Sequence, residues 1–220
     1  METGYIRDIV DSRDWVAETI FGAPAEPLPS RVTLEAICGP AWNQGQTYEC
    51  VAYSAAGLKR FHEYKQSGQL LDFDKHALYA ACKAQDGQPA ANGTFIRIAM
   101  KIIAESGMES DAGTFKIGGY ARLTTIDGIR RALYDGGPVL LGVWIQQEHV
   151  ANLAPPYIFP MPTSPTGGHC MLVVGYDDDL KCFRVRNSWG AFWGECGHCW
   201  IPYDYVTNDP MFDAWTAVDI

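Results

Sequence analysis

Long hydrophobic runs and positive charge are both scarce in this 220-residue chain. No stretch approaches the roughly 18 uninterrupted apolar residues that a bilayer-crossing helix requires, so we expect no membrane span. Acidic residues outnumber basic ones by 26 to 17, which gives a formal net charge of −9. Because such a surface repels phosphate groups, we expect neither nucleic acid nor an anionic membrane as a partner.

The chain also lacks a recognisable export signal and an even number of cysteines. The opening segment Met1–Tyr5 has neither a basic region nor an apolar run, so it is not typical of a secretory signal. An odd number of cysteines cannot pair completely within one chain. We therefore expect most thiols to be reduced and the location to be cytoplasmic. The seven cysteines stand at 38, 50, 82, 170, 182, 196 and 199.

Two of these cysteines have the C-x-x-C spacing of redox and zinc sites. Cys196 and Cys199 lie just before an expected strand, whereas a redox dithiol opens a helix. A zinc site needs a second pair of ligands, and no further C-x-x-C or H-x-x-H follows. We favour ordinary core or surface thiols over a disulfide or a metal site, and we expect no cofactor.

What is present is enough apolar material for a packed core. Apolar residues make up 47% of the chain and aromatic residues 12%, which favours one large domain or two small lobes. Helical periodicity dominates the first half and strand-like runs the second, so we expect an α+β protein with two lobes. The expected boundaries are an N-terminal arm over 1–31, a mainly helical left lobe over 32–115 and a mainly β right lobe over 116–220.

Local patterns predict the individual elements within these lobes. Apolar spacing, caps and glycine stops predict a helical turn near 12–20 and four helices. Runs of β-branched and aromatic residues bounded by turns predict five strands. The helices are expected at 50–66, 74–84, 95–105 and 128–134, and the strands at 139–144, 169–176, 182–188, 198–203 and 214–219.

Three separated segments carry residues suited to nucleophilic catalysis. The segment Asn43–Ser54 places Cys50 where a glycine-containing loop meets a helix, and unpaired N–H groups there favour a thiolate. Gln44 lies six residues upstream as an amide donor. Gly167–Tyr176 places His169 at the mouth of an apolar strand, and Val185–Gly194 places an asparagine at the end of the next strand.

Taken together, the three segments resemble the papain-like cysteine peptidases. The resemblance covers roughly residues 32 to 205 and rests on three motifs in the family's order: Asn-Gln-Gly…Cys…Ala-aromatic-Ser, His-x-x-x-Val-Val-Gly-Tyr and Asn-Ser-Trp-Gly…Trp-Gly. It implies a helical left lobe, an antiparallel β-barrel-like right lobe and an active-site cleft between them. It also implies a peptide or protein as the substrate.

The resemblance implies a role for each matching residue. Cys50 is the expected nucleophile, and His169 the imidazolium that later protonates the leaving amine. Asn187 orients that imidazole by accepting from its ring N–H. The Gln44 side chain and the Cys50 backbone N–H form the expected oxyanion hole. Trp189 covers the histidine–asparagine hydrogen bond and excludes water from it.

The segment before the nucleophile departs from the family pattern. The family signature is C-G-[SA]-C-[WY], and of it Thr47–Val51 retains only the nucleophile. Tyr48 replaces a small glycine and is expected to narrow the unprimed side, while Gly93 is a loosely aligned candidate for the cleft floor. Glu49 brings a carboxylate next to the thiol, which either raises the thiol pKa or only offsets the helix dipole. We group Tyr48, Gly93 and Trp189 as substrate-binding candidates.

Three functions remain open from the sequence. The first is thiol-dependent hydrolysis of peptide bonds, with an endopeptidase favoured over an exopeptidase. The second is a papain-like fold kept as a binding or structural module, which the changes at Tyr48 and Glu49 motivate. The third is acyl transfer from Cys50 to an amine acceptor instead of water.

Overall fold

The computed structural model describes residues 2–22, 27–209 and 212–218. Part of the arm expected over 1–31, the last residue of the strand expected over 214–219 and the chain ends lie outside these residues. The helices are α1 (Ala17–Phe21), α2 (Glu35–Cys38), α3 (Cys50–Ser67), α4 (Lys75–Gln85), α5 (Ile96–Glu105), α6 (Ile126–Asp135), α7 (Gln147–Val150) and α8 (Tyr203–Asn208). The strands are β1 (Tyr5–Ile6), β2 (Arg31–Thr33), β3 (Thr94–Phe95), β4 (Met108–Ser110), β5 (Gly113–Phe115), β6 (Gly119–Leu123), β7 (Val139–Ile145), β8 (Gly167–Asp177), β9 (Cys182–Arg186), β10 (His198–Pro202) and β11 (Asp213–Val218).

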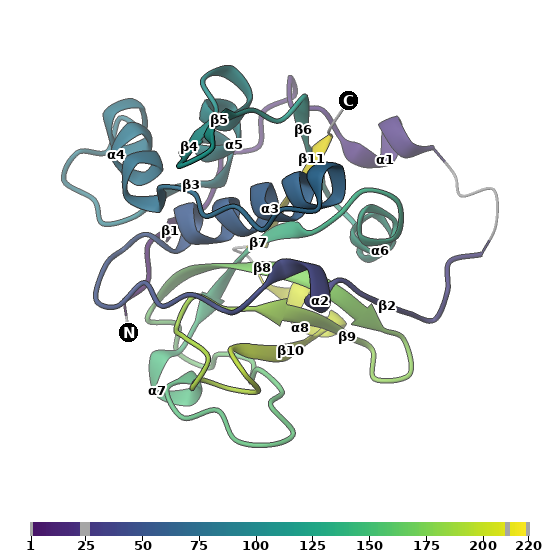
Figure 1. The fold of residues 1–220 in the computed structure, drawn as a ribbon. Coiled ribbons are helices and arrows are strands. Elements are labelled where there is room, and N and C mark those ends of the chain that lie inside the picture. The colour runs from purple at the N-terminus through teal and green to yellow at the C-terminus, as the bar shows by residue number, and fades with distance from the viewer. Residues whose placement is uncertain (1, 23–26, 210–211, 219–220) are drawn as a thin grey trace.

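A seven-stranded antiparallel sheet forms most of one lobe. Its order is β10-β9-β8-β7-β11-β6, and β2 pairs with β8 as a branch. Figure 1 shows α4 and α5 above α3, and the strands β8, β9 and β10 of the sheet below it. The α+β, two-lobe prediction is therefore confirmed, whereas the boundaries at 31/32 and 115/116 stay predictions.

The helix α3 lies at the centre of the molecule, between α4 and α5 on one side and β7 and β8 on the other. Residues 50–63 of this helix are all buried, and the stretch from Cys50 to Leu58 is mostly small and apolar, whereas charged side chains follow from Lys59 onward. Lys59 is tolerated inside because its ammonium pairs with Glu63 at 2.5 Å. Gly68 ends the helix at φ 73°, and its N–H donates to the Tyr64 carbonyl.

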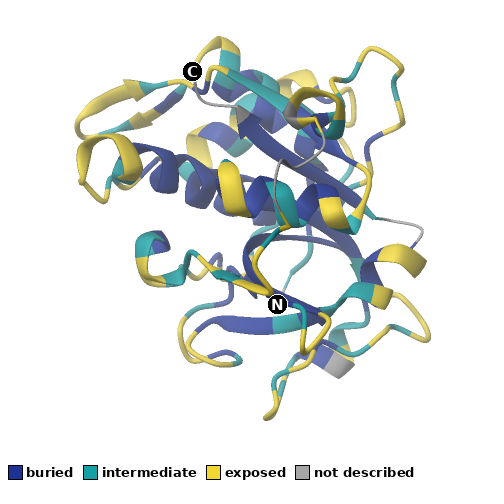
Figure 2. Cartoon of the chain, turned by 90° about the vertical axis from the view of Figure 1, so that its right-hand side faces the viewer, coloured by how far each residue is buried: buried dark blue, intermediate teal, exposed yellow. Residues whose placement is uncertain are grey.

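The long strands β7 and β8 separate two apolar cores. Leu140 and Leu172 face α3, α4 and α5, whereas Leu141 and Val173 face the core shared with α6 and β9. Because both faces of these strands are buried, the alternation of a half-exposed strand disappears and the sequence reads as an unbroken apolar run. Figure 2 shows the buried residues concentrated in the central helix and the strands, and the exposed ones in the outer loops and helices.

The predicted elements agree with the structure except at some ends and in the short pieces. The helical turn expected near 12–20 is a helix only over Ala17–Phe21. The strands expected to end at 188 and 203 end at Arg186 and Pro202, because the chain turns away after Arg186 and α8 begins at Tyr203. The strand β6 was not expected.

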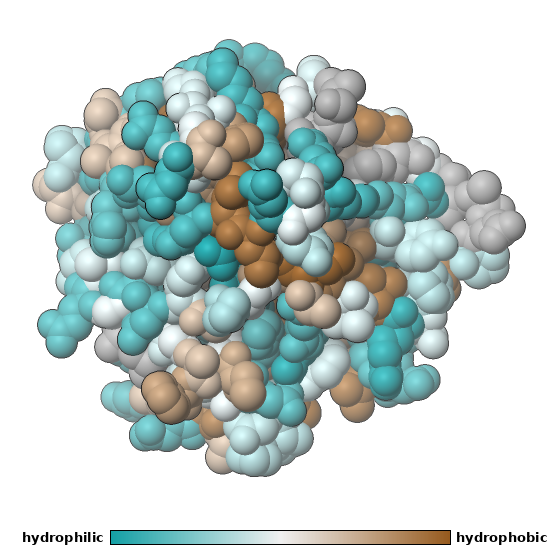
Figure 3. Space-filling model, in the orientation of Figure 1, coloured by the Kyte–Doolittle hydropathy of each residue, from teal (hydrophilic) through white to brown (hydrophobic). Residues whose placement is uncertain are grey.

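Within the described residues, no helix combines the length and the apolar character needed to cross a bilayer. The face drawn in Figure 3 is mostly hydrophilic or neutral, with hydrophobic side chains gathered near its middle.

Candidate active site

Gln44 and Cys50 lie on the loop that enters α3, and the sheet lobe holds that loop in place. Cys50 is the first residue of the helix and is 0% exposed. The Gln44 N–H donates to the Ser188 carbonyl at 2.8 Å, and its Oε1 accepts from the Ser188 hydroxyl at 2.5 Å. The side-chain amide therefore presents only its Nε2 donor, which contacts the Thr47 carbonyl at 2.6 Å and the Glu2 carbonyl at 3.3 Å.

His169 and Asn187 come from neighbouring strands of the sheet. His169 lies in β8 and Asn187 directly follows β9, and His169 Nε2 lies 2.8 Å from Asn187 Oδ1. The same Oδ1 accepts from the Ser188 N–H at 2.8 Å, so it is an acceptor and His169 Nε2 carries the proton. The other ring nitrogen, Nδ1, is buried with no hydrogen-bond partner among the described residues.

A stack of indoles covers this pair. The Trp189 ring lies 4.5 Å from the His169 ring at an interplanar angle of 21°, and Trp193 packs edge-on against Trp189 at 5.2 Å. The Trp193 Nε1–H donates to the Val150 carbonyl at 2.7 Å, which fixes the stack. The hydrogen bond between His169 and Asn187 is consequently shielded from water, which strengthens it.

The helix carrying Cys50 packs directly on the strand carrying His169. The Ser54 hydroxyl, one turn along α3, donates to the Cys170 carbonyl in β8 at 3.2 Å. The Cys170 N–H faces the Cys50 thiol and stabilises its charged form. The structure thus brings Cys50, Gln44, His169, Asn187 and Trp189 to one place between the two lobes.

The N-terminal arm also occupies this place. The strand β1 pairs with β3 in parallel, and the Thr94 N–H donates to the Gly4 carbonyl at 2.9 Å. A Cβ atom at Gly4 would overlap the Tyr48 carbonyl, and one at Gly93 (φ 86°) would overlap the Gly4 carbonyl. Gly93 and Tyr48, expected to bind substrate, therefore contact the chain's own arm through their backbones.

The opposite side of the arm packs on the sheet lobe. A Cβ atom at Gly142 in β7 would overlap the Tyr5 ring, and one at Gly167 in β8 would overlap the Thr3 hydroxyl. Figure 1 shows β1 beside the end of α3 that carries Cys50. The arm therefore lies between Tyr48 and Gly93 on one lobe and Gly142 and Gly167 on the other, and the space between these two walls is called the groove below.

Burial changes the protonation of both candidate catalytic groups, Cys50 and His169. Burial raises the pKa of the Cys50 thiol to about 11, although the N–H groups of Cys170, Gly4 and Val51 act in the opposite direction. Burial also lowers the pKa of His169 to about 4, against the opposite effect of the hydrogen bond that His169 donates to Asn187. For Cys50, desolvation outweighs the stabilisation of the thiolate that the helix start was expected to give. While the site is buried, the Cys50 thiol and the His169 imidazole are therefore both neutral.

The carboxylate beside the nucleophile turns away from it. Glu49 Oε2 pairs with His76 Nδ1 at 2.7 Å, and the His76 ring packs edge-on against Tyr53. Of the two readings of Glu49 from the sequence, the geometry supports the one in which it does not act on the thiol.

The remaining cysteines form no site of their own. All seven are free thiols, with Cys196 exposed and Cys199 buried in the sheet core. Among the described residues, no group of three or more His, Cys, Asp or Glu side chains is arranged to hold a metal ion.

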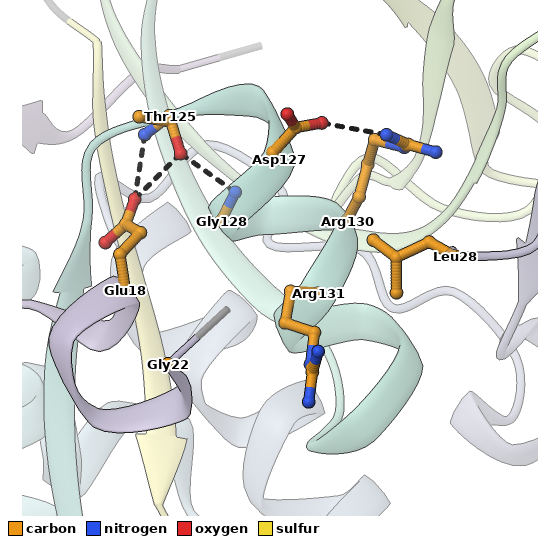
Figure 4. Close-up of a pocket in the computed structure, with 8 residues that line it drawn as sticks. All are labelled: Glu18, Gly22, Leu28, Thr125, Asp127, Gly128, Arg130 and Arg131. Carbon is orange, nitrogen blue, oxygen red and sulfur yellow. Dashed lines mark hydrogen bonds and ion pairs between the residues drawn. The ribbon is translucent and has the colours of Figure 1, made fainter. Parts of the chain in front are cut away.

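A separate hollow of about 250 Å³ lies between α1 and α6 (Figure 4). Both arginines that line this hollow are already paired with carboxylates. Arg130 pairs with Asp127 and Asp178, and Arg131 pairs with Asp135. None of the candidate catalytic residues lines it.

Sequence reasoning predicted an N-terminal arm but not its position over Cys50, and it missed Ser188. The arm contacts the groove through backbone atoms and a two-residue strand, which leave no periodic signal. Ser188 lies inside the Asn-Ser-Trp-Gly motif, so the motif contained it although its function of holding Gln44 was not inferred.

Comparison with known proteins places this geometry in context. The sequence profile of the papain family cysteine proteases matches residues 109–209. The solved structure of xylellain, a cysteine protease from Xylella fastidiosa, superposes with a TM-score of 0.83 at 26% identity, covering 99% of this chain and 96% of that one.

Two curated relatives extend the match to sequence. Cysteine proteinase 3 of Entamoeba histolytica is 27% identical, over 83% of this chain and 65% of its own length. An uncharacterized peptidase C1-like protein of Acanthamoeba polyphaga mimivirus is 34% identical, over 46% of this chain and 37% of its own length. The chain thus spans less than two thirds of either relative. With the family's motif residues gathered between two lobes, the chain is similar in sequence and in fold to the papain-like cysteine peptidases.

Proposed function

We propose that the chain hydrolyses peptide bonds through an acyl-enzyme on Cys50. The observation that carries the proposal is the shielded His169–Asn187 pair, which leaves His169 Nδ1 as the free basic nitrogen beside the helix start that bears the thiol. Similarity to the papain family cysteine proteases over residues 109–209, and to a relative named as a cysteine proteinase, supports it further.

The chemistry follows from these positions. Once the groove is open to solvent, His169 takes the thiol proton and the thiolate attacks the carbonyl carbon of the substrate. His169 then gives the proton to the leaving amine, and it later activates the water that releases the acyl group. Asn187 holds the ring in the required tautomer and Trp189 keeps water from that hydrogen bond.

Gln44 and the Cys50 N–H are proposed to stabilise the oxyanion. Gln44 Nε2 donates to a peptide carbonyl, that of Glu2, at 3.3 Å, which supports its use for a substrate carbonyl. Ser188 fixes the amide orientation through Oε1, so the donor is preorganised and not assembled at the moment of reaction.

We further propose that the chain is an endopeptidase, which cleaves bonds inside a longer peptide. The arm pairs with β3 through the strand Tyr5–Ile6, and it continues beyond the groove toward Asp8. A groove that lets a chain run on suits a bond inside a longer peptide. We also propose a reducing, cytoplasmic setting, since all seven cysteines are free thiols.

A peptide-mixture digest read by mass spectrometry tests the proposal. We expect cleavage inside peptides by the wild type at pH 8, none by Cys50→Ala, and wild-type cleavage by Cys196→Ala, which removes the exposed thiol instead. Gly4→Ala is assayed in parallel, because a displaced arm uncovers the groove. Activity that survives Cys50→Ala, or no cleavage by either the wild type or Gly4→Ala, overturns the proposal.

Two further readings of the digest sharpen it. Release of single terminal residues alone would replace the endopeptidase by an exopeptidase. Amine adducts in place of free acids, formed when an amine is added, would replace hydrolysis by acyl transfer.

A further inference from the structure

A buried cluster of charged side chains lies where the arm leaves the groove. Asp8 on the arm is 2% exposed, and Asp213 in β11 is 1% exposed. The Arg97 N–H in α5 donates to Asp8 at 2.9 Å, and the Arg122 guanidinium in β6 pairs with Asp213 at 2.7 Å. A third carboxylate, Asp14, pairs with Arg97 at 2.6 Å and with Arg122 at 3.7 Å.

The cluster is one positive charge short. It contains three carboxylates and two guanidiniums, and both guanidiniums lie near the indole of Trp215 at 5.4 and 5.6 Å. With every group ionised, the buried set would carry a net charge of −1. An uncompensated buried charge is costly, and a proton shared by two carboxyl groups removes it.

The position of that proton follows from the contacts. The Asp8 carboxyl faces that of Asp213, so the two cannot both ionise cheaply. Burial and Asp213 raise the pKa of Asp8 to about 7, against the N–H and the guanidinium of Arg97. The remaining titratable groups that face the pair are neutral near pH 7, since burial raises the pKa of each: Tyr5 on the arm, Tyr120 in β6 and Cys170 in β8.

The pair is linked to the cover over Cys50 through Tyr5. The Tyr5 hydroxyl donates to Asp213 at 3.3 Å, and its ring packs on Gly142. The next residue toward the N-terminus, Gly4, is the one that packs on Tyr48 and Gly93. Loss of the Asp8–Asp213 contact therefore loosens the segment that closes the groove.

We propose that Asp8 and Asp213 form a proton-dependent latch, which holds the arm over Cys50 in acid and releases it as the pH rises toward neutral. The latch rests on the proposed function, since it regulates access to the same groove.

The direction of the effect follows from proton linkage. The docked arm holds Asp8 with a pKa of about 7, whereas the released arm returns it toward 3.8. Docking therefore takes up a proton and is strongest below the released value. The equilibrium constant for docking of the arm falls by about tenfold per pH unit between pH 3.8 and about pH 7, and it is constant above that range.

The test compares the alkylation of Cys50 by iodoacetamide in the wild type and in Asp8→Asn from pH 5 to pH 8, followed by peptide mass spectrometry. The amide is neutral at every pH and keeps an oxygen for the Arg97 N–H. Because the Cys50 thiol titrates in both proteins, its titration cancels in the ratio of the wild-type rate to the variant rate. The pH dependence of this ratio therefore reports the release of the arm. We expect this ratio to rise about tenfold per unit up to about pH 7 and then to level off.

Two further variants make the outcome decisive. Asp11→Asn removes an arm carboxylate whose ion pair among the described residues is with the exposed Arg13, and its rate should follow the wild type. Asp213→Asn removes the other half of the pair and should lose the pH dependence as Asp8→Asn does. A ratio that is flat from pH 5 to pH 8, or Asp11→Asn behaving like Asp8→Asn, overturns the latch.

The readout keeps the two proposals apart. Alkylation reports access to the thiol and needs no turnover, so an absence of peptide cleavage would leave the latch standing. A flat ratio accompanied by cleavage would remove the latch and leave the peptidase.

Discussion

The two walls of the groove differ in what holds them. On the sheet wall, His169 is fixed by Asn187 and Trp189, and both contacts belong to the sheet lobe itself. On the helix wall, Gln44 Nε2 donates to the arm carbonyl of Glu2, and the thiol of Cys50 faces the arm N–H of Gly4. The contacts that fix His169 on the sheet wall do not involve the arm. On the helix wall, Gln44 and Cys50 both contact the arm.

This difference separates two tasks that an enzyme must solve. The proposed base, His169, and its orienting residue, Asn187, are held by the fold itself, whereas the proposed nucleophile and oxyanion donor, Cys50 and Gln44, are covered by a short segment. Changes in the arm should therefore alter access to Cys50 and leave the His169–Asn187 hydrogen bond in place. Changes in the sheet wall should do the reverse, and the variants below test both directions.

The largest effect is expected on the sheet wall. His169→Ala removes the only proposed proton acceptor for Cys50, and kcat/KM for a peptide substrate should fall by about a hundred- to ten-thousand-fold. The arm stays docked, because its contacts on the sheet wall are to Gly142 and Gly167. Unchanged kcat/KM with an intact circular dichroism spectrum would contradict the assignment of His169 as the base.

A smaller effect is expected when the arm is pushed from the helix wall. In Gly4→Ala the added methyl overlaps the Tyr48 carbonyl, and an overlap of this kind costs about 1–3 kcal/mol. Alkylation of Cys50 should therefore accelerate by roughly 5- to 150-fold at constant pH. Ile9→Ala, which trims an arm side chain that is 82% exposed, is the matched control and should leave the rate unchanged.

The same variant predicts a change in the imidazole. Uncovering the groove restores water to His169, so its pKa should rise from about 4 toward its ordinary value of 6.5. Titration of the ring signals by NMR measures this shift. An unchanged pKa, combined with faster alkylation, would mean that burial by the arm is not what holds the ring neutral.

The contrast between the walls also marks what the sequence predicts. Cys50, His169 and Asn187 each stand at the boundary of a strongly patterned element, so the pattern that predicts the element also predicts the residue's place. Gln44 was found for the same reason, on the loop before α3. The fold class follows from helical spacing in the first half and apolar strands in the second.

The arm escapes such reasoning because its contacts are between residues far apart in the chain. Tyr5 and Asp213 are separated by 208 positions, and no local pattern relates them. The strand β1 is two residues long, too short for alternation to be read. The pKa of Cys50 was misjudged for the same reason, since the helix start is visible in the sequence and the burial that outweighs it is not.

The smallest predicted effect concerns the hydroxyl that joins the arm to the latch. Tyr5→Phe keeps the ring against Gly142 and removes one hydrogen bond to Asp213, at 3.3 Å a long one. Loss of such a bond costs about 1 kcal/mol, so alkylation of Cys50 should quicken by roughly fivefold. Tyr134→Phe, at a tyrosine that is 57% exposed, is the control.

Comparison of Tyr5→Phe with Tyr5→Ala shows whether the ring or the hydroxyl of Tyr5 holds the arm in place. If Tyr5→Phe leaves the alkylation rate unchanged while Tyr5→Ala raises it, packing of the ring on the sheet wall holds the arm. The hydroxyl would then serve Asp213 and not the cover. If both variants raise the rate, the ring and the buried carboxylate act together, and the arm is held at the sheet wall as firmly as at the helix wall it covers.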